Sequence, residues 1–136
     1  MKSRHDALKD ALAERILVLD GAMGTMLQAK SFSEDEYRGQ HFKEHPQEVA
    51  GCHDLLSMTQ PEALVEIHQA YFSAGADIVE TNTFNANGVS LADYGLVDKA
   101  YPINVAAAKV AREAAEKAAL ELSRPYCWVA GSIGPT

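Results

Sequence analysis

The sequence predicts an α/β fold with parallel strands, and two observations lead to this prediction. Short aliphatic runs, "ILVL" at 16–19, "ADIVET" at 76–81 and "YCWVA" at 126–130, are typical of strands, and the first looks covered on both faces, as in a parallel sheet. Helical patterns separate these runs, and only a tight turn divides the helix that precedes Gly75 from the second strand. Such alternation of helix and strand is typical of α/β units.

Size and charge limit the classes of function. The chain has 136 residues, 47% of them hydrophobic, which is enough for one modest core. Nineteen acidic residues against twelve basic ones give a formal net charge of -7. Nucleic-acid binding depends on clustered Lys and Arg, so a nucleic-acid partner is not expected.

Targeting signals and cysteine spacing favour a cytoplasmic protein. The start "MKSRHDALKD" is too polar for a signal peptide, and no apolar run approaches the ~20 residues of a membrane helix. Cys52 and Cys127 lie far apart and do not make a disulfide framework. We therefore expect no membrane partner.

The first third of the chain contains a helix start, a strand and a long polar segment. Ser3 and Asp6 have the spacing of a helix N-terminus, and the strand at 16–20 ends on Asp20. Residues 31–54 are polar and irregular, which predicts a long surface connection with one exposed turn of helix. A zinc site is one interpretation of the possible metal ligands in this segment, which are His41, His45, Cys52 and His53. The favoured interpretation is a solvated loop with scattered histidines, because Pro46 interrupts any helix.

The next helix is the clearest element of the sequence. Thr59 and Glu62 have the spacing of a capping box, Pro61 suits the first turn, and Gly75 suits the left-handed end. His68 is expected to be packed or half-buried beside the apolar stripe. That stripe is Leu64, Ile67, Tyr71 and Ala74.

The last third predicts a short helix, a long helix and a strand. "VSLADYGL" at 89–96 is the short helix, and an alanine-rich helix runs from about Ile103 to Leu122 with a Glu113–Lys117 pair on its wet face. Its apolar stripe would be Val105, Val110, Ala114 and Ala118. Cys127 is expected to be a small buried residue of the final strand. Three strands make one edge of a parallel sheet, so we expect an α/β domain that has been cut short.

Polar and glycine-rich residues follow each predicted strand. The carboxyl ends of parallel strands form the functional face of α/β folds, so these residues should gather there. Asp20 could hold an ammonium group, and the N–H groups of Gly21 and Ala22 could meet a carboxylate, which together suits an amino acid. In the alternative, Asp20 only caps the turn and Gly21 and Gly24 provide positive φ. The predicted site is Asp20, Gly21, Ala22, Glu80, Asn82, Thr83 and Ser132.

Nucleotide binding is disfavoured. The segment "GAMG" lacks the third glycine of the dinucleotide fingerprint, and no Gly-Lys-Ser/Thr is present for a phosphate loop.

Three stretches, "ERILVLDGAMGTMLQ", "LVEIHQAYFSAGADIVETNTFNAN" and "VAGSIGPT", resemble the N-terminal homocysteine-binding module of cobalamin-dependent methionine synthase. The resemblance runs from about Leu12 to Thr136. It implies a (β/α)8 TIM barrel, of which residues 1–136 would be the first three βα units, truncated. About 250 residues make a complete barrel.

The resemblance also implies a reaction. Homocysteine, with its sulfur ligated to zinc as a thiolate, would take the methyl group of methylcobalamin and become methionine. Downstream folate and cobalamin modules would recharge the cobalamin from 5-methyltetrahydrofolate. Asp20 would hold the homocysteine ammonium, with Gly21 and Ala22 on its carboxylate. The zinc of that family is held by three later cysteines that Cys52 and Cys127 do not match, so we expect this portion alone to bind no cofactor and to be inactive.

Two alternatives stay open. A cobalamin-independent homocysteine S-methyltransferase, using betaine or a methylsulfonium donor, resembles the same barrel. The second alternative is a non-catalytic α/β module that associates with itself through an unpaired strand edge.

Overall fold

The computed structural model describes residues 1–136 and is a mixed α/β arrangement that is mostly helical. This confirms the predicted class. Its elements are α1 (Arg4–Glu14), α2 (Met23–Ala29), α3 (Glu34–Arg38), η1 (His53–Leu55), α4 (Leu56–Thr59), α5 (Pro61–Ala74), β1 (Ile78–Glu80), α6 (Gly88–Leu91), η2 (Ala92–Tyr94), η3 (Val97–Lys99), α7 (Ala100–Glu121) and β2 (Trp128–Ala130).

The strands run parallel, as predicted. β1 pairs with β2 in a register that places Val79 opposite Val129. The predicted first strand is extended but joins β1 through one bridge, Leu19 to Ile78. Three backbone bonds join the two segments. The Asp20 N–H donates to the Ile78 carbonyl at 2.9 Å, and the Val18 carbonyl accepts from the N–H groups of Asp77 and Ile78 at 2.8 and 3.2 Å.

The prediction that residues 16–19 are covered on both faces is wrong. Ile16 is 89% exposed, Val18 52% and Leu19 49%. The long helices cover one face of β1 and β2 and reach this edge segment only in part, so branched aliphatic residues remain in contact with solvent.

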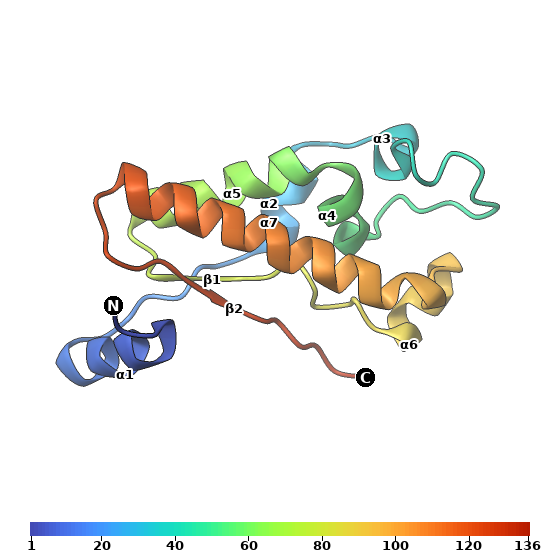
Figure 1. The fold of residues 1–136 in the computed structure, drawn as a ribbon. Coiled ribbons are helices and arrows are strands. Elements are labelled where there is room, and N and C mark those ends of the chain that lie inside the picture. Colours follow the sequence, from blue (N-terminus) through green and yellow to red (C-terminus); the bar gives the residue numbers. More distant parts are fainter.

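Helices α5 and α7 lie side by side over one face of the strands, and α1 lies on the opposite side (Figure 1). A small core fills the space between the helices and the strands. It consists of Phe72, Val79, Ala115, Ala118 and Cys127. The burial of Cys127 was predicted from its place in the strand.

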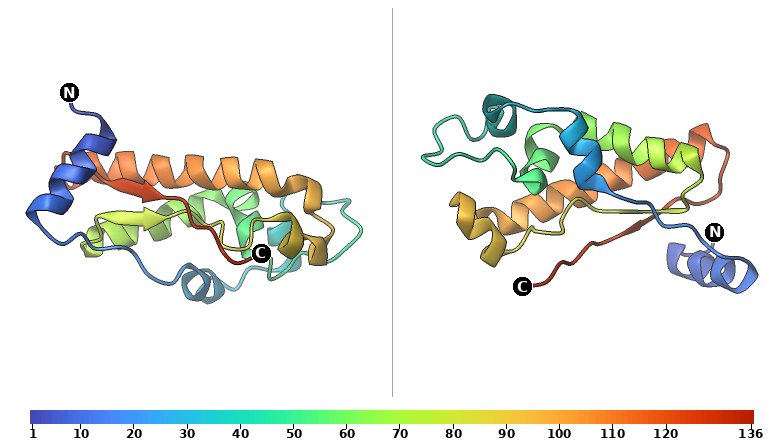
Figure 2. Two further views of the ribbon diagram at one scale, coloured as in Figure 1. Left: turned by 90° about the horizontal axis from the view of Figure 1, so that it is seen from below. Right: turned by 180° about the vertical axis from the view of Figure 1, so that it is seen from behind.

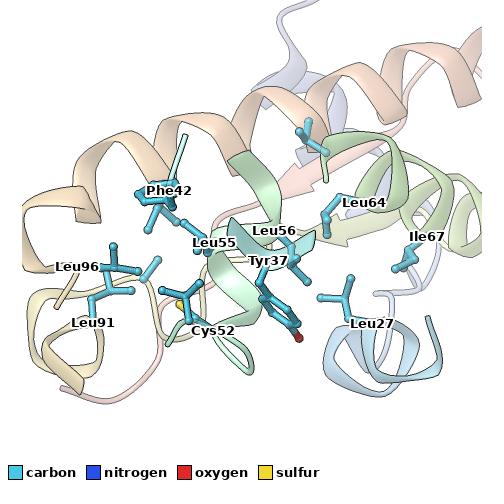
Figure 3. Close-up of a cluster of buried hydrophobic side chains, with 14 of the residues drawn as sticks. Leu27, Tyr37, Phe42, Cys52, Leu55, Leu56, Leu64, Ile67, Leu91 and Leu96 are labelled. Carbon is cyan, nitrogen blue, oxygen red and sulfur yellow. The ribbon is translucent and has the colours of Figure 1, made fainter. Parts of the chain in front are cut away.

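The larger core lies where α4, α5 and α7 meet the polar connection (Figure 3). Tyr37, Phe42, Val49 and Cys52 of the connection are all buried in it. The interpretation of 31–54 as a surface connection is therefore wrong for these residues, although α3 does supply the predicted turn of helix, with a capping box at Ser33.

Two charged side chains order this connection. Arg38 donates hydrogen bonds to the carbonyls of Phe42, Lys43, His45 and Gln47. Glu34 accepts from the N–H groups of Val49 and Ala50 and pairs with Arg38 at 3.2 Å. Because these bonds satisfy polar backbone, apolar residues of the loop can enter the core.

The ends of α1 and α5 show which local signals hold. Ser3 caps α1 by accepting from the Asp6 N–H, Pro61 opens α5, and Gly75 ends it at φ 118°, all as predicted. The Thr59–Glu62 capping box is wrong. Gln60 precedes α5 without a side-chain cap, and Thr59 belongs to α4, where its hydroxyl donates to the Leu55 carbonyl.

The predicted stripe of α5 holds at Leu64 and Ile67, whereas Tyr71 is half-buried and Ala74 is exposed. His68 is fully buried, in agreement with the prediction that it packs.

The last third follows the prediction closely. The short helix is present as α6 and η2, and α7 begins three residues before the expected start. Val110, Ala114 and Ala118 are buried, Val105 is half-buried, and Glu113 pairs with Lys117 at 3.4 Å. No helix combines the length and apolar character needed to cross a membrane.

An ion pair fastens α1 to the amino end of β1. Arg15 bonds both carboxylate oxygens of buried Asp77, at 2.7 and 3.0 Å, and Asp77 also accepts from the Val18 N–H. Trp128 Nε1 donates to the Arg4 carbonyl. These contacts hold α1 beneath the strands, away from their carboxyl ends (Figures 1 and 2).

Candidate functional site

A pocket of about 450 Å³ lies at the carboxyl ends of the strand segments. All seven residues predicted from the sequence line it, because each lies at or shortly after the carboxyl end of a strand segment and parallel strands end at the same edge. The complete lining is Asp20, Gly21, Ala22, Met23, Gly24, His53, Asp54, Glu80, Thr81, Asn82, Thr83, Phe84, Asn85 and Ser132.

Asp20 has an unsatisfied carboxylate oxygen. Its Oδ2 accepts from the Glu80 N–H at 3.1 Å, while Oδ1 is shielded from water and has no hydrogen-bond donor. Burial, together with a smaller contribution from the neighbouring Glu80 carboxylate, raises the pKa of Asp20 to about 6. A positively charged donor would relieve both costs.

The turn after Asp20 presents backbone donors. Neither the Gly21 N–H nor the Ala22 N–H donates a hydrogen bond within the chain, whereas the Ala22 carbonyl accepts from the Tyr71 hydroxyl at 2.8 Å. The alternative in which Gly21 and Gly24 serve positive φ is wrong, since neither has it. Asp20 also bonds across to β1 instead of to its own turn.

A closed ring of hydrogen bonds joins the ends of β1 and β2. The Ser132 N–H donates to Thr81 Oγ1 at 3.0 Å, and Thr83 Oγ1 donates to the Ser132 carbonyl at 2.7 Å. The two threonine hydroxyls lie 2.7 Å apart, so Thr81 must donate to Thr83. The ring gives this pocket wall one rigid geometry.

Sequence reasoning missed the other seven residues of the lining, and four of these have polar side chains: His53, Asp54, Thr81 and Asn85. The polar connection was expected to be solvated, yet it turns inward at Asp54 because Leu55 and Leu56 enter the core. That apolar pair directly after Asp54 was the available signal. His53 is held by Tyr37, whose hydroxyl lies 3.0 Å from its Nδ1.

The charge of the pocket favours a cation. Three carboxylates, from Asp20, Asp54 and Glu80, line it, and no Lys or Arg does. An anionic group of a ligand would therefore have to bind neutral donors, among them the backbone N–H groups of Gly21 and Ala22. A zwitterion with an ammonium and a carboxylate matches both kinds of partner.

The metal ligands considered from the sequence do not converge. His45 Nε2 bonds the Tyr94 carbonyl at 2.7 Å, and His53 bonds Tyr37. Cys52 and Cys127 are free, buried and outside the pocket. No group of three or more His, Cys, Asp or Glu side chains could hold a metal ion.

The chain is similar to known proteins in sequence and in structure. The family model described as homocysteine S-methyltransferase matches residues 17–136. The oxidized form of the homocysteine methyltransferase MmuM from Escherichia coli superposes with a TM-score of 0.73 at 27% sequence identity. Its metallated form gives 0.72 and 26%.

The extent of the match is unequal. It covers 94% of this chain but 40% of the oxidized MmuM chain and 41% of the metallated one. The chain thus spans less than half the length of the solved proteins that it resembles.

Proposed function

The chain belongs to the homocysteine S-methyltransferase family, and on this premise we propose that its pocket binds homocysteine and forms the N-terminal portion of a methyltransferase that makes methionine. Its share of the MmuM length supports the view that residues 1–136 are one part of a (β/α)8 barrel. Asp20 binds the ammonium group in this proposal, and the N–H groups of Gly21 and Ala22 bind the carboxylate.

One observation carries the proposal. Asp20 Oδ1 is buried, lacks a donor and belongs to a pocket that already contains other carboxylates. Leaving a buried acceptor unpaired costs about 1–3 kcal/mol, which an ammonium group would recover. Because the pKa of Asp20 is about 6, its carboxylate is largely ionised at neutral pH and can pair with that ammonium.

The zinc ion of the family does not fit the residues of this chain. MmuM is known in a metallated form, but here the two cysteines are buried away from the pocket. Residues 1–136 thus supply the amino-acid end of the substrate site. We place the ligands of the thiol-activating zinc on other residues of the complete enzyme.

The methyl donor separates two candidate functions. The segments "DGAMGT" and "ETNTF" favour the cobalamin-dependent enzyme, with folate and cobalamin modules downstream. The structural similarity to MmuM is equally compatible with a cobalamin-independent methyltransferase. Reading the coding region beyond Thr136 decides between them, because cobalamin and folate modules follow the barrel only in the first case.

Ligand dissection tests the proposed pocket. We would titrate the 136-residue chain by NMR with L-homocysteine, with 4-mercaptobutanoate, which lacks the ammonium, and with 3-mercaptopropylamine, which lacks the carboxylate. Asp20→Asn should weaken L-homocysteine and 3-mercaptopropylamine binding by about 10-fold or more, because a charge-assisted bond contributes about 1.5–3 kcal/mol. Binding of 4-mercaptobutanoate should be unchanged.

The controls make the outcome specific. Asp98→Asn, at an exposed carboxylate outside the pocket, should leave all three affinities unchanged. Wild-type affinity for homocysteine should rise as the pH increases through about 6, where Asp20 ionises. If Asp20→Asn binds homocysteine like the wild type, Asp20 is only a structural residue; cooperative unfolding without any binding would favour a non-catalytic module.

A further inference from the structure

Two segments far apart in the sequence brace one another at the pocket. The Asn82 Nδ2 group, from the loop after β1, donates to the His53 carbonyl at 2.8 Å and to Ser57 Oγ at 3.3 Å. In return, the Asn85 N–H donates to Asp54 Oδ1 at 3.0 Å. The polar connection is thereby joined to the loop that carries the threonine ring.

Burial makes this brace rigid. Asp54 is 5% exposed, Ser57 2% and Asn82 8%. Water cannot readily replace bonds in such surroundings, so loss of one partner leaves the other unsatisfied. A continuous set of bonds therefore runs from η1 through the loop at 81–85 to Ser132 at the end of β2.

Asp54 occupies an unusual place in this set. It lines the main pocket and also a second cavity of about 210 Å³, which lies against Cys52 and Tyr94. Asn85 lines both cavities as well, so the hydrogen bond between the Asn85 N–H and Asp54 Oδ1 lies at the partition between them. Burial raises the pKa of its carboxyl, and the bond from Asn85 opposes that rise.

We propose that Asp54 is a positioning residue of the amino-acid pocket: by accepting the Asn85 N–H it fixes the loop at 81–85, and so sets the wall against which the substrate binds. The inference rests on the proposed homocysteine pocket. It assigns part of the substrate site to the polar connection, which composition alone marks as surface.

Two substitutions at Asp54 separate the hydrogen bond from the charge. Asp54→Asn keeps the size and one carbonyl acceptor, whereas Asp54→Ala removes the acceptor. We expect Asp54→Ala to weaken L-homocysteine binding by about 10-fold and Asp54→Asn to restore affinity to within about 2-fold of the wild type.

A matched control distinguishes positioning from general stability. Asn104 belongs to α7 and does not line the pocket. Asn104→Ala removes two partly buried hydrogen bonds, which the side chain donates to the carbonyls of Ala86 and Ala100. It should lower the melting temperature without changing homocysteine affinity. Equal losses of affinity in Asp54→Ala and Asn104→Ala would overturn the proposal, and so would an Asp54→Asn variant as weak as Asp54→Ala.

Amide hydrogen exchange tests the brace without any ligand. In Asp54→Ala the exchange of the Asn85 amide should accelerate about 10-fold relative to Asn104→Ala. Unchanged exchange would overturn the positioning role. If Asp54→Ala speeds the exchange of the Asn85 amide but the wild-type chain binds no homocysteine, the proposed function is refuted, whereas the contribution of Asp54 to the loop at 81–85 is still supported.

Discussion

The buried imidazole of His68 should make the chain sensitive to acid. Its side chain is fully buried in α5, and neither ring nitrogen has a hydrogen-bond partner. Burial lowers its pKa from 6.5 to about 4. His68→Leu replaces the ring by an apolar side chain, which needs no partner in that position.

The size of the effect follows from the two pKa values. Between pH 6.5 and 4 the unfolded chain binds a proton at His68 that the folded chain does not, so stability falls as the pH falls. At pH 5 the loss is about 2 kcal/mol, and at pH 7.5 it is about zero. About 2 kcal/mol corresponds to roughly 5–10 °C in melting temperature for a chain of this size.

Urea denaturation at pH 7.5 and 5.0 measures this difference. His68→Leu should be at least as stable as the wild type at pH 7.5 and gain about 2 kcal/mol over it on moving to pH 5. Titration of Asp20 is common to both proteins and cancels in the comparison. His41→Leu, at an exposed histidine, should keep the wild-type pH dependence. Equal pH dependence in His68→Leu and the wild type would refute the reasoning.

Two further substitutions test the ion pair at the amino end of β1 and the order of the polar connection. Arg15→Ala should lower the urea midpoint, because buried Asp77 loses both guanidinium bonds. Arg15 holds the pKa of Asp77 down, so the difference in stability between the variant and the wild type should shrink as acid protonates Asp77. A variant midpoint equal to that of the wild type at pH 7 would contradict this. Glu34→Ala should lower the free energy of unfolding by about 2 kcal/mol and speed amide exchange over residues 39–50, since the N–H groups of Val49 and Ala50 lose their acceptor. Exchange at wild-type rates would show that Arg38 alone orders the loop.

Local signals were the most predictable part of the fold. Pro61 and Gly75 mark the ends of α5 because their conformational preferences act within one turn. The capping box at Thr59 failed because a neighbouring element competes for the same residue. A preceding short helix uses Thr59, which leaves the first turn of α5 without a side-chain cap.

Burial was less predictable than secondary structure. The aliphatic run at 16–19 predicts an extended segment correctly but not its cover, which depends on where α5 and α7 pack. The polar composition of 31–54 hides Tyr37 and Phe42, because one Glu–Arg pair satisfies the backbone around them. Composition does not reveal such a pair.

The candidate site was predictable where one rule governs it. Residues that follow parallel strands meet at one edge, so Asp20, Glu80 and Ser132 gather as expected, although their chemical roles remain predictions. His53 and Asp54 enter the site through bonds to residues about thirty positions away, and no local pattern announces these partners.

The hydrogen bonds of the pocket also set when it can form during synthesis. The bond of Asp20 cannot form until Glu80 has been made, 60 residues later, and the bond of Thr81 cannot form until Ser132 has been made, 51 residues later. At about 5–20 residues per second, each interval takes roughly 3–12 s of translation. For that time a strand-like edge with exposed aliphatic side chains has left the ribosome without its neighbour, and it needs protection from other nascent chains. The pocket described here is complete only after Ser132 has been made.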